Sequence, residues 1–245
     1  METFPIQAPA FNGHSRVVAS GSAFEWLRQG WALFIVNPGL WIALTIVLLV
    51  VLLGLSIVPL VGPLAANLLT PMLGAGMLLA CQKVADGKTP EIPDLFAGFR
   101  HNSSALVMLG VLYMAAMLLI FAIAVVLGGG SLAGGLMMGH AAGIGLAFGG
   151  MIFAMLLSLA LSVPLFMAIW FAPALVFFNN MQPVEALKAS FNACLKNTLP
   201  FLVYGLLVMV LAFFAALPVF LGFLVLIPVL SGSVYASYRD IFVAN

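Results

Sequence analysis

Hydrophobic residues in this chain run in long blocks, and charged residues fall in four short clusters between the blocks. No Asp, Glu, Lys or Arg occurs at positions 29–82, 101–184 or 197–238. One membrane crossing takes about 20 apolar residues, so each of these three stretches has room for two crossing helices. The pattern therefore predicts an all-α polytopic membrane protein with six transmembrane helices.

The expected crossings follow from the apolar runs and from the prolines and glycines that separate them. A Gly-rich stretch, 128–145, is expected to be the connection inside the second pair of helices. A proline inside the second helix of each pair predicts a kink. The three pairs are 39–58 with 64–84, 104–127 with 146–178, and 199–217 with 219–242.

Positive charge predicts the orientation. All eight Lys and Arg residues lie in the four charged clusters, and basic residues favour the cytoplasmic side of a membrane. Six crossings with every cluster on one side place both termini in the cytoplasm. Residues 1–21 are expected to be a flexible cytoplasmic tail, and 22–245 a single transmembrane domain. The expected location is the bacterial inner membrane.

Composition supports the membrane class and excludes others. The chain is 64% hydrophobic and 6% charged, whereas a soluble domain carries about 25% charged residues. The net charge of +1 gives no indication of nucleic-acid binding. The first apolar run starts too late and is too long for a cleavable signal peptide. Cys81 and Cys194 fall near the expected cytoplasmic boundary, so no disulfide is expected.

An internal repeat accompanies the three pairs of helices. Asn37, Asn102 and Asn197 each precede the first helix of a pair. Apolar side chains stand ten and six residues before each of them, as Leu27 and Trp31 do before Asn37. This spacing places apolar groups on one face of a helix. Such a face is typical of a short amphipathic helix lying in the membrane interface.

The second helix of each pair adds a matching proline, Pro71, Pro164 or Pro228, followed by two apolar residues. The unit is expected to be an interfacial helix plus a helical hairpin, used three times in parallel. Pro90 and Pro93 should shorten the interfacial helix of the middle copy. The alternative is that interfacial helices before crossings resemble one another without being a repeat. The three copies are expected over about 22–85, 86–180 and 181–245.

Two segments resemble signatures shared by several uncharacterised bacterial membrane families. One is 182–190 continuing to 196–198, and the other combines 86–88 with 94–99. The group resembled includes YciC-like inner-membrane proteins and the membrane domain attached to some glycerophosphodiester phosphodiesterases. The resemblance implies a six-crossing membrane protein of poorly known role. The soluble phosphodiesterase domain of some of those relatives is not expected here, so their activity is not carried over.

Basic residues beside the crossings are expected to form a collar that attracts anionic lipid headgroups. Each such residue contributes about 1 kcal/mol near an anionic surface. The same charges also mark topology, and the two roles are compatible. The collar residues are Arg28, Lys83, Lys88, Arg100, Lys188 and Lys196.

Polar and small residues inside the crossings are expected to serve helix packing. Asn67 is the most polar of them, and we expect it to hydrogen-bond to a neighbouring helix. Gly150, Ala154, Ser158 and Ser162 follow one another at four-residue spacing. Such a stripe lets another backbone approach closely, either within the chain or in a homo-oligomer.

The best candidates for catalysis lie in the second charged cluster. Asp86, Glu91, Asp94 and His101 could bind a metal or transfer protons if they converged. Their spacing fits no zinc signature, and solvated loop residues explain them as well. His140, with two neighbouring methionines, is too small a set for a copper site. We therefore expect no catalytic residue, no metal and no cofactor.

The leading hypothesis is a non-enzymatic inner-membrane protein of unknown biochemical role. It would act through membrane lipids, membrane-protein partners or a homo-oligomer, in envelope or membrane-complex organisation. The alternative is a transporter or channel for an uncharged or lipid-like small molecule. A polar chamber at mid-depth would favour transport, whereas a groove open to lipid would favour the first hypothesis.

Overall fold

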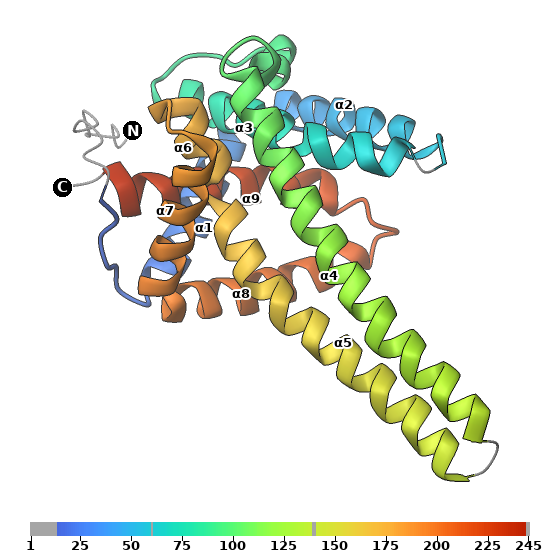
Figure 1. Cartoon of the computed structure of the whole chain (residues 1–245). Helices are drawn as coiled ribbons and strands as arrows, with labels where there is room; N and C mark the ends of the chain where they lie inside the picture. The colour runs from blue at the N-terminus through green and yellow to red at the C-terminus, as the bar shows by residue number, and fades with distance from the viewer. Residues whose placement is uncertain (1–13, 60, 139–140, 244–245) are drawn as a thin grey trace.

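A computed structural model describes residues 14–59, 61–138 and 141–243. Within these ranges the regular elements are helices, with no strand (Figure 1). They are α1 (Ser22–Val36), α2 (Pro38–Ser56), α3 (Val61–Ala85), the 3-10 helix η1 (Ile92–Phe99), α4 (Ser103–Met138), α5 (Ala141–Trp170), α6 (Ala172–Asn179), α7 (Pro183–Lys196), α8 (Thr198–Ala216), α9 (Phe223–Tyr238) and the π-helical turn η2 (Arg239–Val243).

Five of the described helical segments are long and apolar enough to cross a membrane. They are α2, α3, α4, the α5–α6 run and α8. The expected sixth crossing corresponds to α9, whose 16 residues fall short of the about 20 that a crossing takes. The backbone turns between Leu217 and Gly222, where Val219 and Phe220 have positive φ, so α9 begins later than expected.

The Gly-rich stretch 128–145 is not a loop where it is described, which corrects the expectation. α4 continues through it to Met138, and α5 begins at Ala141. In apolar surroundings the backbone must satisfy its own hydrogen bonds, so a helix persists despite a cost of about 1 kcal/mol per glycine. The glycines instead bring the two helices together: a Cβ on Gly135 would lie 2.8 Å from the Cβ of Ala147.

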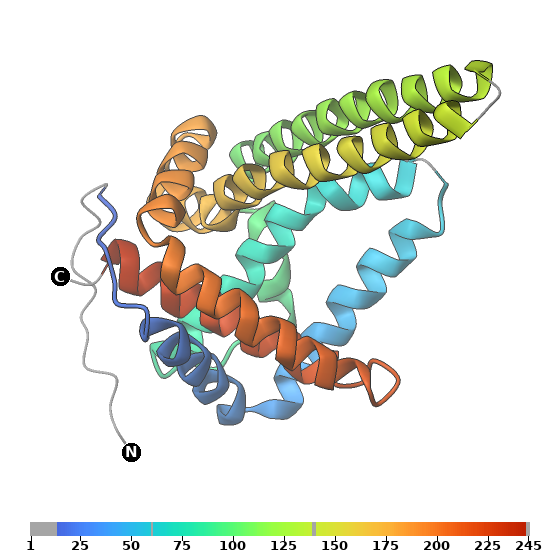
Figure 2. The same ribbon diagram turned by 90° about the horizontal axis from the view of Figure 1, so that it is seen from below.

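The α4–α5 hairpin is the longest part of the molecule and extends away from the other helices (Figures 1 and 2). The 36 residues of α4 span about 54 Å at 1.5 Å per residue. A bilayer core is about 30 Å thick. This excess length accounts for the separation of Asn102 and Pro164 by 62 residues, whereas Asn37 and Pro71 are 34 residues apart. The expected single helix 146–178 is broken at Phe171, and Pro173 occupies the first turn of α6, where proline is tolerated.

Short helices precede α2, α4 and α8, as the sequence predicts. α1 and α7 are regular α-helices of 15 and 14 residues, whereas η1 has eight residues. The expected shortening of the middle helix is confirmed.

The apolar side chains of α1 do not share one face. Trp26 and Leu33 are buried against the protein, whereas Phe24, Trp31 and Ile35 point outward and are at least half exposed. The pattern of three- and four-residue spacings did not separate the protein-facing side from the outer side, because both are apolar.

Each short helix packs on a Pro-containing helix of a different hairpin. α1 lies on α9, where a Cβ on Gly30 would lie 2.8 Å from the backbone nitrogen of Ser233. η1 lies on α3, where a Cβ on Gly98 would lie 2.8 Å from Met72 Cα. α7 lies on α5, where the Ser190 hydroxyl donates to the carbonyl at position 167 over 2.7 Å. Gly30 and Gly98 therefore leave no space for a side chain at their contacts.

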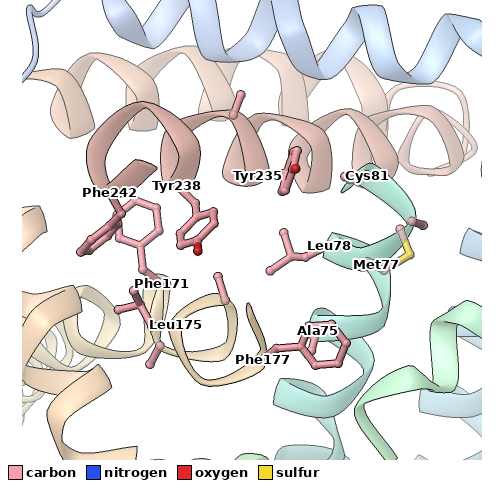
Figure 3. Packing of buried hydrophobic residues seen from close by; sticks show 14 of the residues in the cluster. Ala75, Met77, Leu78, Cys81, Phe171, Leu175, Phe177, Tyr235, Tyr238 and Phe242 are labelled. Atoms are coloured by element: carbon pink, nitrogen blue, oxygen red, sulfur yellow. The ribbon is translucent and has the colours of Figure 1, made fainter. Parts of the chain in front are cut away.

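The core forms where α3, α6 and α9 meet (Figure 3). Phe171 packs edge-on against Phe242 at 5.4 Å between ring centroids, and Phe178 stacks on Tyr238 at 5.7 Å. The Tyr238 hydroxyl donates to Asn179 Oδ1 over 2.5 Å. The end of α9 and the following η2 are thereby fixed to α6 at the end of the second hairpin.

Candidate functional site

The six expected collar residues lie at the surface and differ in their exposure and in their ion pairing. Lys83 is partly buried, and its ammonium group donates to both carboxylate oxygens of Asp94 over 2.7 and 2.8 Å. Arg28 is exposed and forms a two-point ion pair with Glu25 at 2.8 and 2.9 Å, which holds the pKa of Glu25 below its ordinary value. The other four, all exposed, are Lys88, Arg100, Lys188 and Lys196.

The four candidate catalytic residues do not converge. Asp94 pairs with Lys83 and accepts a 2.7 Å hydrogen bond from the backbone N–H of Glu91, which starts η1. His101 packs edge-on against Phe177 at 5.3 Å. Asp86 and Glu91 are exposed. Among the described residues, no group of three or more His, Cys, Asp or Glu side chains could hold a metal ion. His140 lies outside the described residues.

Asn67 does not make the expected bond to another helix. Its side chain is exposed and donates to the Pro63 carbonyl over 2.9 Å, one turn back in α3. An amide facing an apolar medium satisfies itself on its own helix when no polar group faces it.

The small-residue stripe of α5 lies against α4. A Cβ on Gly150 would collide with Ser131, and the Cβ of buried Ala154 lies 3.5 Å from the ideal Cβ position of Gly128. Ser158 and Ser162 donate to carbonyls of their own helix over 2.7 and 2.8 Å. The stripe therefore contributes to packing within the chain.

Asn197 has a larger structural role than the sequence indicated. It is 1% exposed, and its Oδ1 accepts from the backbone N–H of Val18 over 2.8 Å. Its Nδ2 donates to the carbonyls of Arg16 and Ala193 over 3.0 and 2.9 Å. The segment before α1 is therefore held at the α7–α8 junction.

Both ends of the described chain meet at Asp240. Its carboxylate pairs with Arg16 and accepts a 2.9 Å hydrogen bond from the indole of Trp26. Arg16 also donates its backbone N–H to the Ile241 carbonyl over 3.0 Å. Arg16 and Asp240 belong to the charged clusters that the sequence analysis used for topology. In the structure they join the segment before α1 to η2, which follows α9.

A cavity of about 340 Å³ lies between α2, α3, α9 and the α5–α6 junction. Its wall includes Met77, Trp170 and Val234, each six residues past the matching proline of its helix. The hydroxyls of Thr70 and Ser231 also line it, but both donate to carbonyls of their own helices. The remaining lining is apolar. We call this cavity the central chamber.

A second cavity, the α5–α8 groove, has a volume of about 510 Å³. Phe166 of α5 and Phe201 of α8 both line it, and Gly205 leaves open space in α8. Cys194 lies at the α7 end, where burial raises the pKa of its thiol to about 12, so the thiol stays neutral.

Trp170 separates the two cavities and lines both. Its ring packs edge-on against Phe201 at 6.1 Å and Tyr204 at 5.9 Å. Its indole N–H is buried without a hydrogen-bond partner in the described structure. The sequence analysis missed Trp170. The signal that could have found it is its offset from Pro164, which equals that of Met77 from Pro71.

Comparison with known proteins supports the membrane class. No known family model and no solved structure matches the chain. The chain is 34% identical over 226 residues to a protein of Burkholderia thailandensis named "Probable inner membrane protein", and the match covers 89% of this chain and 82% of the relative. The apolar helices agree with that name. The chain therefore belongs to the family of multi-pass bacterial inner-membrane proteins that this relative represents.

Proposed function

We propose that the protein is a non-enzymatic inner-membrane protein that acts by binding membrane lipids. The observation that carries this proposal is the chemistry of the two cavities. Their walls are apolar, and the hydroxyls of Thr70 and Ser231 in the central chamber are already hydrogen-bonded within their own helices. Apolar cavities do not hold water well, so such a wall suits a hydrocarbon chain better than a hydrated solute.

The proposal includes six crossings in three repeated units. α9 continues without a break into η2, which adds five residues to its 16 and gives enough length to cross. The packing order supports the repeat: α1 lies on α9, η1 on α3 and α7 on α5. Each unit thereby places its short helix on the Pro-containing helix of another unit, in a closed cycle. The central chamber lies where the three Pro-containing helices approach one another.

Charge supports the remaining part of the proposal. The exposed basic residues would face anionic headgroups on the cytoplasmic side, with both termini on that side. Membrane lipids are the partners best supported by this chemistry. Membership of the YciC-like group, with its six-crossing domain, fits the same arrangement.

Transport of a lipid-like molecule stays the alternative. The two cavities share Trp170 as a wall, so a chain could pass between them if the indole moved. Binding is the simpler role, because the lipid does not have to pass from one cavity to the other.

Lipid analysis of the purified protein tests the proposal. In a mild detergent, we expect the protein to retain phospholipid at about one molecule per chain or more, measured by mass spectrometry of extracted lipids and of the intact complex. Added phosphatidylglycerol should raise the unfolding temperature of delipidated protein. Exchange of Lys88, Arg100, Lys188 and Lys196 for Gln should reduce the preference for phosphatidylglycerol over phosphatidylcholine. The absence of retained lipid, together with an unfolding temperature that lipid leaves unchanged, would contradict the proposal.

A further inference from the structure

The α5–α8 groove exists because α8 packs on α1, α7 and α9 and leaves a space on its α5 side. Its volume of about 510 Å³ falls within the about 300–1,000 Å³ typical of ligand sites. Phe166 of α5 and Phe201 of α8 contribute aromatic rings to its lining. In a protein of the inner membrane, the molecule that surrounds such a groove is lipid.

Hydrogen-bond donors around the groove are already used, with one exception. The Tyr204 hydroxyl is hydrogen-bonded to Ser233 at 2.6 Å, and the Thr198 hydroxyl donates to the Leu195 carbonyl over 2.8 Å. The indole N–H of Trp170 is buried without a partner in the described structure. A buried unpaired donor costs about 1–3 kcal/mol, and an indole can only donate. The group that would satisfy it must be an acceptor.

These observations define one ligand chemistry. The ligand has a long apolar chain that fills the groove and a hydrogen-bond acceptor close to that chain. An ester carbonyl at the head of an acyl chain has both. A few polar groups in an otherwise apolar wall are the usual way in which ligand sites fix orientation.

We propose that the α5–α8 groove binds one acyl chain of an ester-linked glycerophospholipid, and that the ester carbonyl accepts a hydrogen bond from the Trp170 indole N–H. Because this N–H is buried and without a partner in the described structure, the proposal includes a turn of the indole toward the groove when the lipid binds. The inference rests on the proposed lipid-binding function. It adds the binding site, the part of the lipid that is bound and the hydrogen bond that orients it.

Glycines with open space provide matched variants for the test. A Cβ on Gly205 would meet nothing within 4 Å, so Gly205→Leu places a side chain in the groove without a backbone clash. Gly74→Leu does the same in the central chamber. Gly149→Leu is the control, because Gly149 lies on α5, also has open space, and lines neither cavity.

The experiment uses the full chain in vesicles of phosphatidylethanolamine and phosphatidylglycerol, with a trace of phosphatidylcholine that carries a photoreactive diazirine on one acyl chain. Crosslinked peptides are mapped by mass spectrometry. We expect crosslinks in 163–170 and 201–208, lowered about tenfold by Gly205→Leu and unchanged by Gly149→Leu and Gly74→Leu. Crosslinks elsewhere, or an unchanged yield in Gly205→Leu, would overturn the groove as the site.

An ether-linked analogue tests the polar contact, because it keeps both chains and lacks the carbonyls. In detergent titrations of delipidated protein, we expect the ester lipid to bind about tenfold tighter than the ether lipid, and the difference to vanish in Trp170→Phe. Equal affinities in the unsubstituted protein would overturn the hydrogen bond. If the protein retains lipid but neither result appears, the site is wrong and the proposed function stands. If the protein retains no lipid, the proposed function fails first.

Discussion

The centre of the molecule and the outer part of its α4–α5 hairpin use small residues in different ways. In the centre, Gly30 and Gly76 lie against the backbones of other helices, with no space for a methyl group. Along the hairpin, Gly135 and Gly150 lie against the facing helix, but Gly129, Gly130 and Gly149 have open space around them. Large apolar residues there face outward, and Met137 is 89% exposed. The centre is held by the protein itself, whereas the hairpin relies on surrounding lipid to cover it.

Polar side chains differ in the same way. In the centre they join distant segments, as Asn197 joins α7 to the residues before α1. In the hairpin, Ser131, Ser158 and Ser162 bond to carbonyls of their own helix. Substitutions should therefore have large effects in the centre and small effects on the outward side of the hairpin.

The largest contrast is expected between two glycines. Gly30→Leu would drive a side chain into the backbone of α9 at Val229 and Ser233, so α1 has to move away. We expect a loss of about 3 kcal/mol in unfolding free energy, seen as a lower unfolding temperature in mild detergent. Gly149→Leu should leave that temperature unchanged. Equal effects would show that the close contact of α1 with α9 does not stabilise the fold.

Two asparagines give the next contrast. Asn197→Ala leaves the Val18 N–H and the Arg16 carbonyl without their partner, and we expect a loss of about 2 kcal/mol. Asn67→Ala removes an exposed bond within one helix and should cost less than about 0.5 kcal/mol. Thermal unfolding in detergent measures both, and protease cleavage before α1 should increase in Asn197→Ala alone. An Asn67 variant as unstable as the Asn197 variant would contradict the assigned roles.

Two ion pairs give the smallest contrast. Asp94→Ala removes the partner of the partly buried Lys83 and the acceptor at the start of η1, and we expect a loss of about 1–2 kcal/mol. Glu25→Ala breaks an exposed pair with Arg28 on one helix and should cost about 0.3–0.5 kcal/mol. High salt should remove the second effect and leave most of the first. A similar salt response in both variants would place Asp94 among ordinary surface charges.

Local rules predicted the features that depend on neighbouring residues. Charge-free apolar blocks predicted the long helices, and Pro90 and Pro93 predicted the short η1. The same rules failed where glycine was taken to indicate a loop, because the cost of glycine in a helix is measured in water and 128–138 lies in a strongly apolar helix. The contacts of Gly30 with Ser233 depend on residues about 200 positions apart, which no local pattern specifies.

The candidate site was less predictable than the fold. The six basic residues lie at the surface, as their charge predicts, and their collar role stays a prediction. The cavities depend on how α5, α8 and α9 are spaced. Trp170 looked like an ordinary aromatic residue, and its significance came from an unpaired N–H that only the three-dimensional arrangement reveals.

The contact between α1 and α9 has a consequence for biosynthesis. Trp26 and Gly30 leave the ribosome about 200 residues before their partners Asp240 and Ser233. Until α9 has been made, the surface of α1 that packs on it has no partner helix. The contact between these two helices therefore forms only after α9 has been synthesised, and a nascent chain stalled before α9 would leave α1 unpacked.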